Sequence, residues 1–186
     1  MPEEASVIIR VVDRVSEIDH ADWSALSNPA RGSDTSKYSY NPFVSHEFYS
    51  SMEDSKSAVR ETGWLAQHLI METDTSGKEN EIIGIVPAYL KNHSQGEYVF
   101  DHGWADALHR AGGNYYPKLQ CAVPFTPANG PRLLAKNPDA KNALLSAMIQ
   151  ACQEWGFSGA HLTFLELDDK AACEAAGLLM RQDRQF

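Results

Sequence analysis

The sequence predicts a mixed fold of the α/β (α+β) class, in which a mainly antiparallel sheet is flanked by helices. An apolar hairpin over residues 64–72 and 81–93 and a well-marked helix after Asn137-Pro138 are the clearest elements. Strand-like and helix-like runs follow the order β-α-α-β-β, a middle insertion, then α-β-α-β. We expect a single domain over residues 1–186, because domains usually run to about 100–200 residues.

The N-terminal part predicts one strand and two short helices. The run Ser6–Val12 (SVIIRVV) is rich in β-branched residues, which is typical of a strand. Asp19 can cap a short helix, and Ser45 can cap a second helix over roughly residues 46–54. Between them, residues 27–41 are rich in Ser, Asn, Gly and Pro and predict a loop.

The middle of the chain predicts an antiparallel hairpin and a further strand. The two apolar runs of the hairpin are separated by DTSGKEN, a polar turn that contains glycine. Pro87 lies inside the second run and has no backbone N–H, which indicates a bulge or an edge at that point. Residues 116–123 predict another strand, and the prolines and Asn-Gly after it predict turns.

The best-marked helix begins after Asn137, which can act as its cap, with Pro138 at the first helical position. Gly156 supplies its stop. Its apolar face comprises Leu144, Met148, Ala151 and Trp155.

The C-terminal part predicts a strand, a short helix and a last strand. The strand covers residues 160–166, and the Ala-rich helix is capped by Asp168 and closed by Gly177. The last strand begins at Leu178 and runs to the end of the sequence. We therefore expect this chain to be the N-terminal part of a longer protein.

Composition argues against several classes of protein. Apolar residues make up 43% and charged residues 22%, which is typical of a globular domain. The net charge of −9 argues against broad nucleic-acid binding and against an anionic membrane surface. Because no signal-peptide core or membrane-length apolar run occurs, we expect a cytoplasmic protein without membrane insertion. The three cysteines lack disulfide or metal spacing and are expected to be buried thiols.

Residues 99–118 (VFDHGWADALHRAGGNYYPK) gather acids, histidines and aromatic residues in one short span. If residues 101–112 form a helix, its side chains divide into two faces. The apolar face comprises Trp104, Leu108 and Ala111, and the polar face comprises His102, Asp106 and His109. The polar face is expected to point away from the core.

An Asp one helical turn from a His can orient the imidazole and raise its basicity. His102 and Asp106 are therefore a candidate pair for deprotonating an attacking amine. The alternative is that Asp101 only caps the helix and that the polar face is a solvated surface.

Tyr115 and Tyr116 are adjacent, and adjacent strand residues point to opposite faces, so only one is expected to reach a cleft. Arg110–Asn114 (RAGGN) has neither the helix end nor the spacing of a coenzyme-binding loop, and indicates a helix stop. No P-loop, Rossmann glycine pattern, GxSxG or HExxH occurs. The motifs by themselves indicate no cofactor and no metal.

Several runs together resemble the FemAB-like family of N-acyltransferases, described in bacteria as peptidoglycan biosynthesis/recognition proteins. They span roughly residues 40–186, in order: NPFVSHEF, VPAYLKNHSQGEYVFDHGWADA, GGNYYPKLQCAVPFTPANGPRLL, HLTFL and RQF. The resemblance implies a GNAT-type fold. Since family members are about twice this length, it also implies that residues 1–186 are the N-terminal half of a two-domain protein, with a C-terminal GNAT-like half as its partner.

The resemblance implies transfer of an acyl or aminoacyl group from an activated donor, acyl-coenzyme A or aminoacyl-tRNA, to an amine acceptor. Such a reaction needs alignment of the substrates, a base and an oxyanion donor. Asp101 and Asp106 are then candidates to bind or deprotonate the amine, beside His102 as a candidate catalytic residue. The candidate substrate-binding residues are Lys91 and Lys118 for an anionic donor, with Trp104, Tyr115, Tyr116 and Thr126.

Two other functions stay open. One is a noncatalytic module that binds an amine-bearing or cell-wall-type ligand, or that pairs with another domain. The other is a docking protein, whose contact surface is the Trp104 face together with the aromatic, proline-rich segment 115–131.

Overall fold

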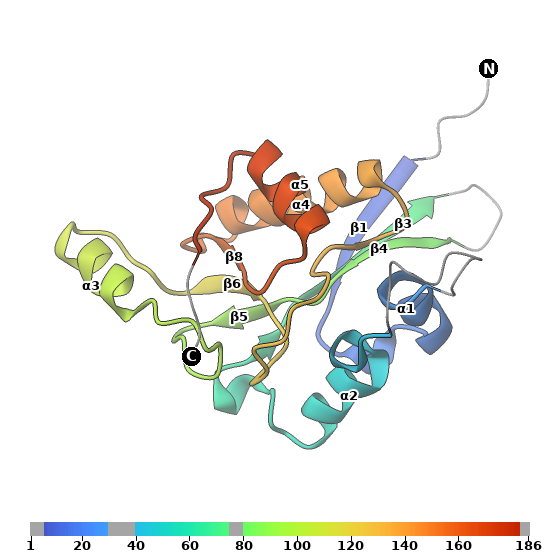
Figure 1. Cartoon of the computed structure of the whole chain (residues 1–186), viewed down its shortest axis with the longest axis horizontal. Helices are drawn as coiled ribbons and strands as arrows, with labels where there is room; N and C mark the ends of the chain where they lie inside the picture. The colour runs from blue at the N-terminus through green and yellow to red at the C-terminus, as the bar shows by residue number, and fades with distance from the viewer. Residues whose placement is uncertain (1–5, 30–39, 75–79, 183–186) are drawn as a thin grey trace.

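The computed structural model describes residues 6–29, 40–74 and 80–182. Within them the strands form two four-stranded sheets, and five α-helices lie around the sheets (Figure 1). The mixed, mainly antiparallel α+β class predicted from the sequence is confirmed. Most of the expected loop at 27–41 and most of the DTSGKEN turn lie outside the described residues.

The first sheet is antiparallel throughout. It contains β1 (Ser6–Val12), β3 (His68–Asp74), β4 (Ile82–Val86) and β7 (Leu134–Ala135), in the order β1-β3-β4-β7. β1 has the bounds predicted from its β-branched run. β7 was not expected, because its two residues follow a proline-rich segment that predicted only turns.

The second sheet has the order β2-β5-β6-β8. Its strands are β2 (Leu65–Ala66), β5 (Tyr89–Lys91), β6 (Lys118–Cys121) and β8 (Ala160–Leu162). β2, β5 and β6 pair antiparallel, whereas β6 and β8 are parallel. Parallel neighbours need a long connection, and here that connection includes β7 and α4.

Helices cover both sides of the sheets (Figure 1). α1 (His20–Ser27) and α2 (His46–Asp54) pack with one core cluster, and α4 (Pro138–Glu154) and α5 (Leu167–Ala175) pack with the other. Residues from β3 and β4 belong to both clusters, because alternate side chains of a strand point to opposite faces.

Helix starts follow the predicted caps in three cases. The side chains of Asp19, Ser45 and Asn137 each accept a backbone N–H in the first turn of α1, α2 and α4. The prediction for α5 was wrong by two residues: Glu166 occupies the cap position, and Asp168 lies in the first turn. Gly177 follows α5 with φ +79°, a conformation that glycine adopts without steric cost.

The predicted hairpin is formed, but both of its runs divide between the two sheets. β4 ends at Val86, Pro87 cannot donate to a ladder, and β5 begins at Tyr89. On the facing run, Gln67 separates β2 from β3, and its N–H donates to the carbonyl of Ala88 at 2.8 Å. Pro87 therefore marks the point at which the sheets diverge, rather than a bulge within one sheet.

A buried Glu–His pair holds this point of divergence. The N–H of Ala88 donates to Nδ1 of His68 at 3.1 Å, so the ring proton lies on Nε2, 2.9 Å from Oε1 of Glu53. The other carboxylate oxygen accepts the N–H of Val15 at 2.9 Å. The pair thus ties α2, β3 and the chain after β1 to the residue beside Pro87.

Two further predictions were wrong. α3 (His102–Arg110) projects from the body of the protein, and no residue of it is buried (Figure 1). Its expected core face is solvated, with Trp104 53% exposed, because α3 lies against neither sheet. Residues 178–182 form no strand, and residues 183–186 of the expected last strand lie outside the described part of the chain.

A second buried charge cluster organises the segment that leads into β7. Asp169 of α5 accepts the backbone N–H groups of Arg132 and Leu133, and its second oxygen accepts Nζ of Lys141 at 2.6 Å. The guanidinium of Arg132 donates to the carbonyls of Thr163, Pro131 and Ala128. A single carboxylate therefore satisfies donors from two different segments.

Asp169→Ala should lower the free energy of unfolding by about 3–5 kcal/mol, because it leaves buried N–H groups and a lysine without their acceptor. Urea denaturation measures the change. Asp168→Ala is the matched control, since Asp168 is exposed in the same helix turn, and its effect should stay within about 0.5 kcal/mol. Equal effects for the two variants would contradict the assigned role of Asp169.

Candidate functional site

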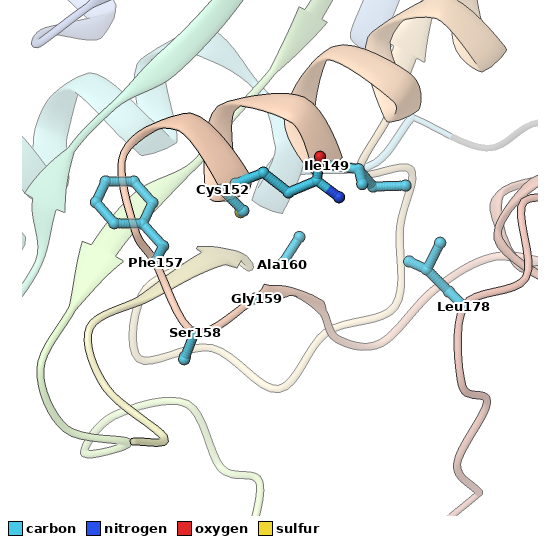
Figure 2. Close-up of a pocket in the computed structure, with 8 residues that line it drawn as sticks. Ile149, Cys152, Phe157, Ser158, Gly159, Ala160 and Leu178 are labelled. Atoms are coloured by element: carbon cyan, nitrogen blue, oxygen red, sulfur yellow. The ribbon is translucent and has the colours of Figure 1, made fainter. Parts of the chain in front are cut away.

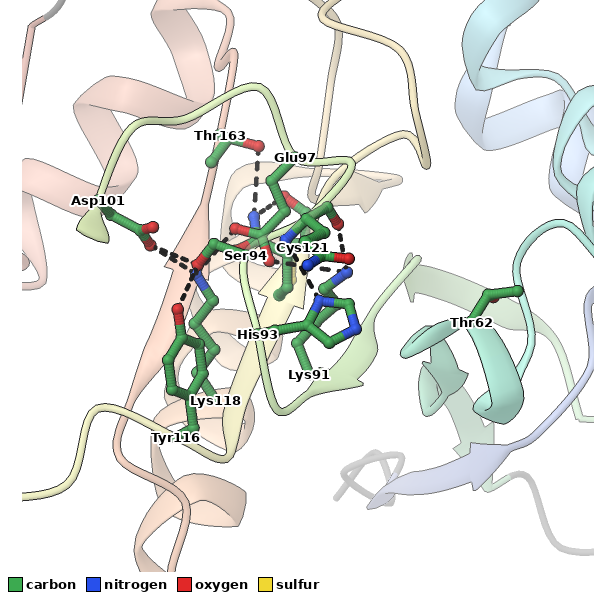
Figure 3. Close-up of polar contacts among 12 residues, drawn as sticks. Thr62, Lys91, His93, Ser94, Glu97, Asp101, Tyr116, Lys118, Cys121 and Thr163 are labelled. Carbon is green, nitrogen blue, oxygen red and sulfur yellow. Dashed lines mark hydrogen bonds and ion pairs between the residues drawn. The ribbon is translucent and has the colours of Figure 1, made fainter. Parts of the chain in front are cut away.

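The ammonium group of Lys118 is the centre of a buried polar network. Lys118 begins β6 and is fully buried. Its Nζ donates to Oγ of Ser94, Oε2 of Glu97 and Oδ2 of Asp101, each at 2.8 Å (Figure 3). All three acceptors lie in segment 92–101, which connects β5 to α3. The three N–H bonds of one lysine therefore hold that segment against the second sheet.

Two tyrosines that precede Lys118 in the chain join the same network. The hydroxyl of Tyr115 donates to Oδ2 of Asp101 at 2.9 Å. The hydroxyl of Tyr116 lies 2.8 Å from Oγ of Ser94 (Figure 3). Both hydroxyls reach the network, whereas strand alternation predicted that the two side chains point to opposite faces. Because β6 begins at Lys118, both residues precede the strand, and strand alternation does not apply to them.

Lys91 lies beside Lys118, because the two residues are register partners on β5 and β6. Its Nζ donates to the carbonyl of Gln95 at 2.9 Å and lies 3.5 Å from the ring centre of Trp64. Oε1 of Glu97 is 3.9 Å away. Burial lowers the pKa of Lys91 to about 8, although the negative charge of Glu97 opposes this shift.

The network contains two lysines and two carboxylates, so its formal charge is balanced. Burial acts to raise the pKa of Asp101, but hydrogen bonds from Lys118 and Ser94 outweigh it and hold that pKa below its usual value. Burial raises the pKa of Glu97 against the opposing effect of Lys118. Asp101 is therefore the carboxylate that stays ionised most readily.

One face of the second sheet carries Lys91, Lys118 and Gln120. From here on, the polar face means this face of the sheet and not the polar face of the helix. Tyr89 and Gln120 are register partners on the polar face, and Trp64 packs edge-on against Tyr89 with ring centres 5.3 Å apart. Within the described residues, five buried side-chain atoms have no hydrogen-bond partner. They are Nε1 of Trp64, the hydroxyl of Tyr89, Oε1 of Glu97, Oδ1 of Asp101 and Oε1 of Gln120. All five belong to the polar face or to groups packed on it, which marks this region as a candidate site.

The other candidate residues lie outside the network. His102 and Asp106 are exposed on α3, and neither side chain makes a hydrogen bond or ion pair to any described residue. Trp104 is stacked under the guanidinium of Arg181, whose Cζ lies 3.3 Å from the ring centre. Thr126 is half-buried, and its hydroxyl donates to the carbonyl of Pro124 at 3.1 Å. The structure thus brings together Lys91, Asp101, Tyr115, Tyr116 and Lys118.

A family model for FemAB-like proteins, described as peptidoglycan biosynthesis/recognition, matches residues 14–186. The chain belongs to the FemAB-like family. No curated protein and no solved structure matches it. Membership connects this FemAB-like chain with peptidoglycan and, at a coarse level, with aminoacyl transfer.

The FemAB-like chain also has an apolar hollow of about 250 Å³ at the end of α4 (Figure 2). Ile149, Cys152, Phe157 and Leu178 are among its lining residues. Burial raises the pKa of Cys152 to about 11, so its thiol is protonated at neutral pH and is a weak nucleophile. The thiol in this hollow is therefore poorly suited to act as a nucleophile in acyl transfer.

Two kinds of feature are absent from the described residues. Within residues 6–29, 40–74 and 80–182, no group of three or more His, Cys, Asp and Glu side chains could hold a metal ion. Among the same residues, no helix has the length and apolar character needed to cross a membrane.

Sequence reasoning missed Ser94, Glu97 and His161. A lysine inside an apolar strand signals that a buried acceptor is needed, but it does not say which loop supplies it. His161 on β8 is the register partner of Gln120, and its ring packs edge-on against Tyr115 with centres 5.2 Å apart. It therefore borders the network in this FemAB-like protein.

Lys118→Met should destabilise this FemAB-like chain by about 3–5 kcal/mol, because it leaves Asp101 and Glu97 buried without their main counter-charge. Urea denaturation of the variant and the wild type measures the difference. Lys136→Met is the control, since its ion pair with Glu81 is exposed and is expected to contribute less than about 1 kcal/mol. A loss no larger than that of the control would contradict a network centred on Lys118.

His161 should titrate well below neutral pH, because burial and the nearby charge of Lys118 lower its pKa to about 4. NMR titration of the imidazole measures this value, and His161→Gln assigns the resonance by removing it. Since the pKa is lower in the folded state, the contribution to stability is present above pH 6.5 and is lost as the pH falls towards 4. A titration midpoint near 6.5 would contradict the burial of this ring.

Proposed function

We propose that this FemAB-like chain acts in the transfer of an acyl or aminoacyl group to an amine of a peptidoglycan-type acceptor. We further propose that the Lys118 network binds that amine, that the reaction is cytoplasmic, and that a C-terminal GNAT-like half is the partner. The proposal rests on one feature of the network, which is the direction of its hydrogen bonds.

Those directions follow from counting protons. Lys118 uses all three of its N–H bonds as a donor, one of them to Ser94. Ser94 donates its only hydroxyl proton to Oδ2 of Asp101 at 2.8 Å. Tyr116 must therefore be the donor in its contact with Ser94, and Tyr115 is the donor to Asp101. Both phenol protons point inward, which leaves the oxygen lone pairs of two half-buried tyrosines to accept from a ligand.

Such a site favours a hydrogen-bond donor over an acceptor. An amine or ammonium can donate to the two phenol oxygens, whose own protons are held by Ser94 and by the carboxylate of Asp101. During transfer, the neutral amine nitrogen forms a bond to the acyl carbon, the bond from that carbon to the leaving group breaks, and the proton lost by the nitrogen goes to the leaving group. Because its pKa is lowered, Asp101 suits binding of the ammonium better than removal of its proton.

A binding module without catalysis is the second candidate. The burial of both Lys91 and Lys118 favours it, since neither ammonium is exposed to hold an anionic donor. In that case the donor, acyl-coenzyme A or aminoacyl-tRNA, binds to the C-terminal half, and this chain supplies only the acceptor site. The two candidates differ in whether residues 1–186 carry out transfer themselves, and agree on the ligand of the network.

Tyr116→Phe should raise the KM for a muropeptide amine by about tenfold to a hundredfold, because it removes an acceptor for a charged N–H group worth about 1.5–3 kcal/mol. Two measurements test this. One follows transfer of a labelled acyl group from each donor class, and the other measures binding of the amine by calorimetry. Tyr40→Phe is the control, since Tyr40 is exposed and far from the network in sequence.

The outcomes separate the two candidates. Transfer that weakens in Tyr116→Phe supports the acyltransferase, and amine binding without transfer from either donor supports the binding module. Unchanged affinity for the amine in both Tyr115→Phe and Tyr116→Phe, with folding intact, would contradict the proposed acceptor site.

A further inference from the structure

The outer edge of β1 lacks the features that protect most exposed strands. β1 is the first strand of its sheet and pairs with β3 in regular register over all seven residues, from Ser6 with Asp74 to Val12 with His68. It contains no proline and no lysine, and it has no bulge against β3. Natural edge strands are usually short, bulged, covered or charged, because an open edge pairs with other strands.

The one charge on this strand is already engaged. Arg10 donates to Oε1 of Glu72 on β3 from two nitrogens, at 2.8 and 2.9 Å. Its guanidinium is therefore held towards the neighbouring strand of the same sheet. It does not point away from the edge, as a protecting charge would.

The side chains of β1 extend a core layer beyond the helix that covers it. Ile9 is opposite Met71 and Val11 is opposite Leu69, and both of these β3 residues are buried in the cluster that contains α4. Val7, Ile9 and Val11 lie on that same face, yet they are 37–49% exposed. The apolar layer thus continues into partly exposed side chains of β1, and among the described residues no strand pairs with the outer edge of β1.

We propose that β1 is an interface for a second copy of this chain, which pairs its own β1 antiparallel across a two-fold axis at Ile9. The two sheets then become one continuous sheet of eight strands. In this register Ile9 faces Ile9 of the partner subunit, and Val7 faces Val11 of the partner subunit. The interface is isologous, and the exposed row on the α4 side is complementary to itself.

Charge and position select this register. A two-fold axis perpendicular to the sheet requires one residue to face its own copy, because only then do facing side chains lie on the same side. An axis at Arg10 would place two arginines directly opposite each other, which is destabilising. An axis at Ile9 overlaps all of residues 7–11 and pairs β-branched side chains, which favour cross-strand packing. This sequence therefore matches its own copy over the whole exposed row.

Sedimentation of the full chain over a concentration series tests the proposal, and a reversible dimer is the expected result. Ile9→Lys places two ammonium groups at the axis and should raise the dimer dissociation constant by more than about tenfold. Val7→Lys should act in the same direction, and circular dichroism should show that both variants are folded. Lys56→Glu is a charge control, because Lys56 is exposed and lies far from β1 in sequence.

Cross-linking tests the register without relying on stability. Antiparallel partners have Cα atoms about 4.5–5.5 Å apart, which suits a disulfide, so Ile9→Cys should form a dimer on mild oxidation. Ile8→Cys is the matched control, since Ile8 faces Arg10 of the partner subunit and its own copy lies beyond disulfide reach. The native cysteines are buried and should not interfere.

Three results would overturn the proposal. They are a monomer at every concentration, a dimer that Ile9→Lys and Val7→Lys leave unchanged, and cross-linking through position 8 instead of position 9. None of these measurements depends on acyl transfer, so the interface stands or fails independently of the proposed function.

Discussion

The burial of one ammonium group, that of Lys118, determines how the second sheet is covered. Moving a charged group out of water costs several kcal/mol, and only hydrogen bonds and opposite charges in the interior offset that cost. Here segment 92–101 supplies them. Its charged side chains are buried and its aromatic side chains are exposed, which is the reverse of the usual arrangement. Glu97 and Asp101 are buried, while the aromatic rings of Tyr98 and Phe100 point outward. The position of this segment is therefore set by electrostatics rather than by apolar packing.

The divergence of the two sheets makes room for that arrangement. Pro87 ends β4, and the buried Glu53–His68 pair holds the adjacent backbone, so β5 and β6 continue in a different sheet. Their polar face is then covered by a loop and by aromatic side chains instead of a helix. A loop can bring hydroxyl and carboxylate groups to a buried lysine more readily than a helix face can, because its backbone is not committed to regular hydrogen bonds.

Features that depend on neighbouring residues could be predicted from the sequence. β1, three helix caps and an irregularity at Pro87 follow from β-branched runs, side-chain caps and a missing N–H, all of which act within a few residues. The lysines and Asp101 could be named as candidate site residues, but Ser94 and Glu97 could not, because Lys118 and Ser94 are 24 positions apart. α3 carries a regular apolar face, yet periodicity does not show whether anything packs against it. The expected His102–Asp106 pair depended on the assumption that the apolar face of α3 packs against the core.

The same buried charge that holds segment 92–101 also determines what the outer hydroxyls can bind. Lys118 donates one N–H to Ser94, and the carboxylate of Asp101 accepts the only hydroxyl proton of Ser94. Ser94 then has no proton left for Tyr116, so Tyr116 donates to Ser94 and keeps its lone pairs for other donors. Each link in the chain from Lys118 through Ser94 to Tyr116 therefore has one direction. The proposed preference for a ligand N–H thus originates at groups that the ligand does not touch.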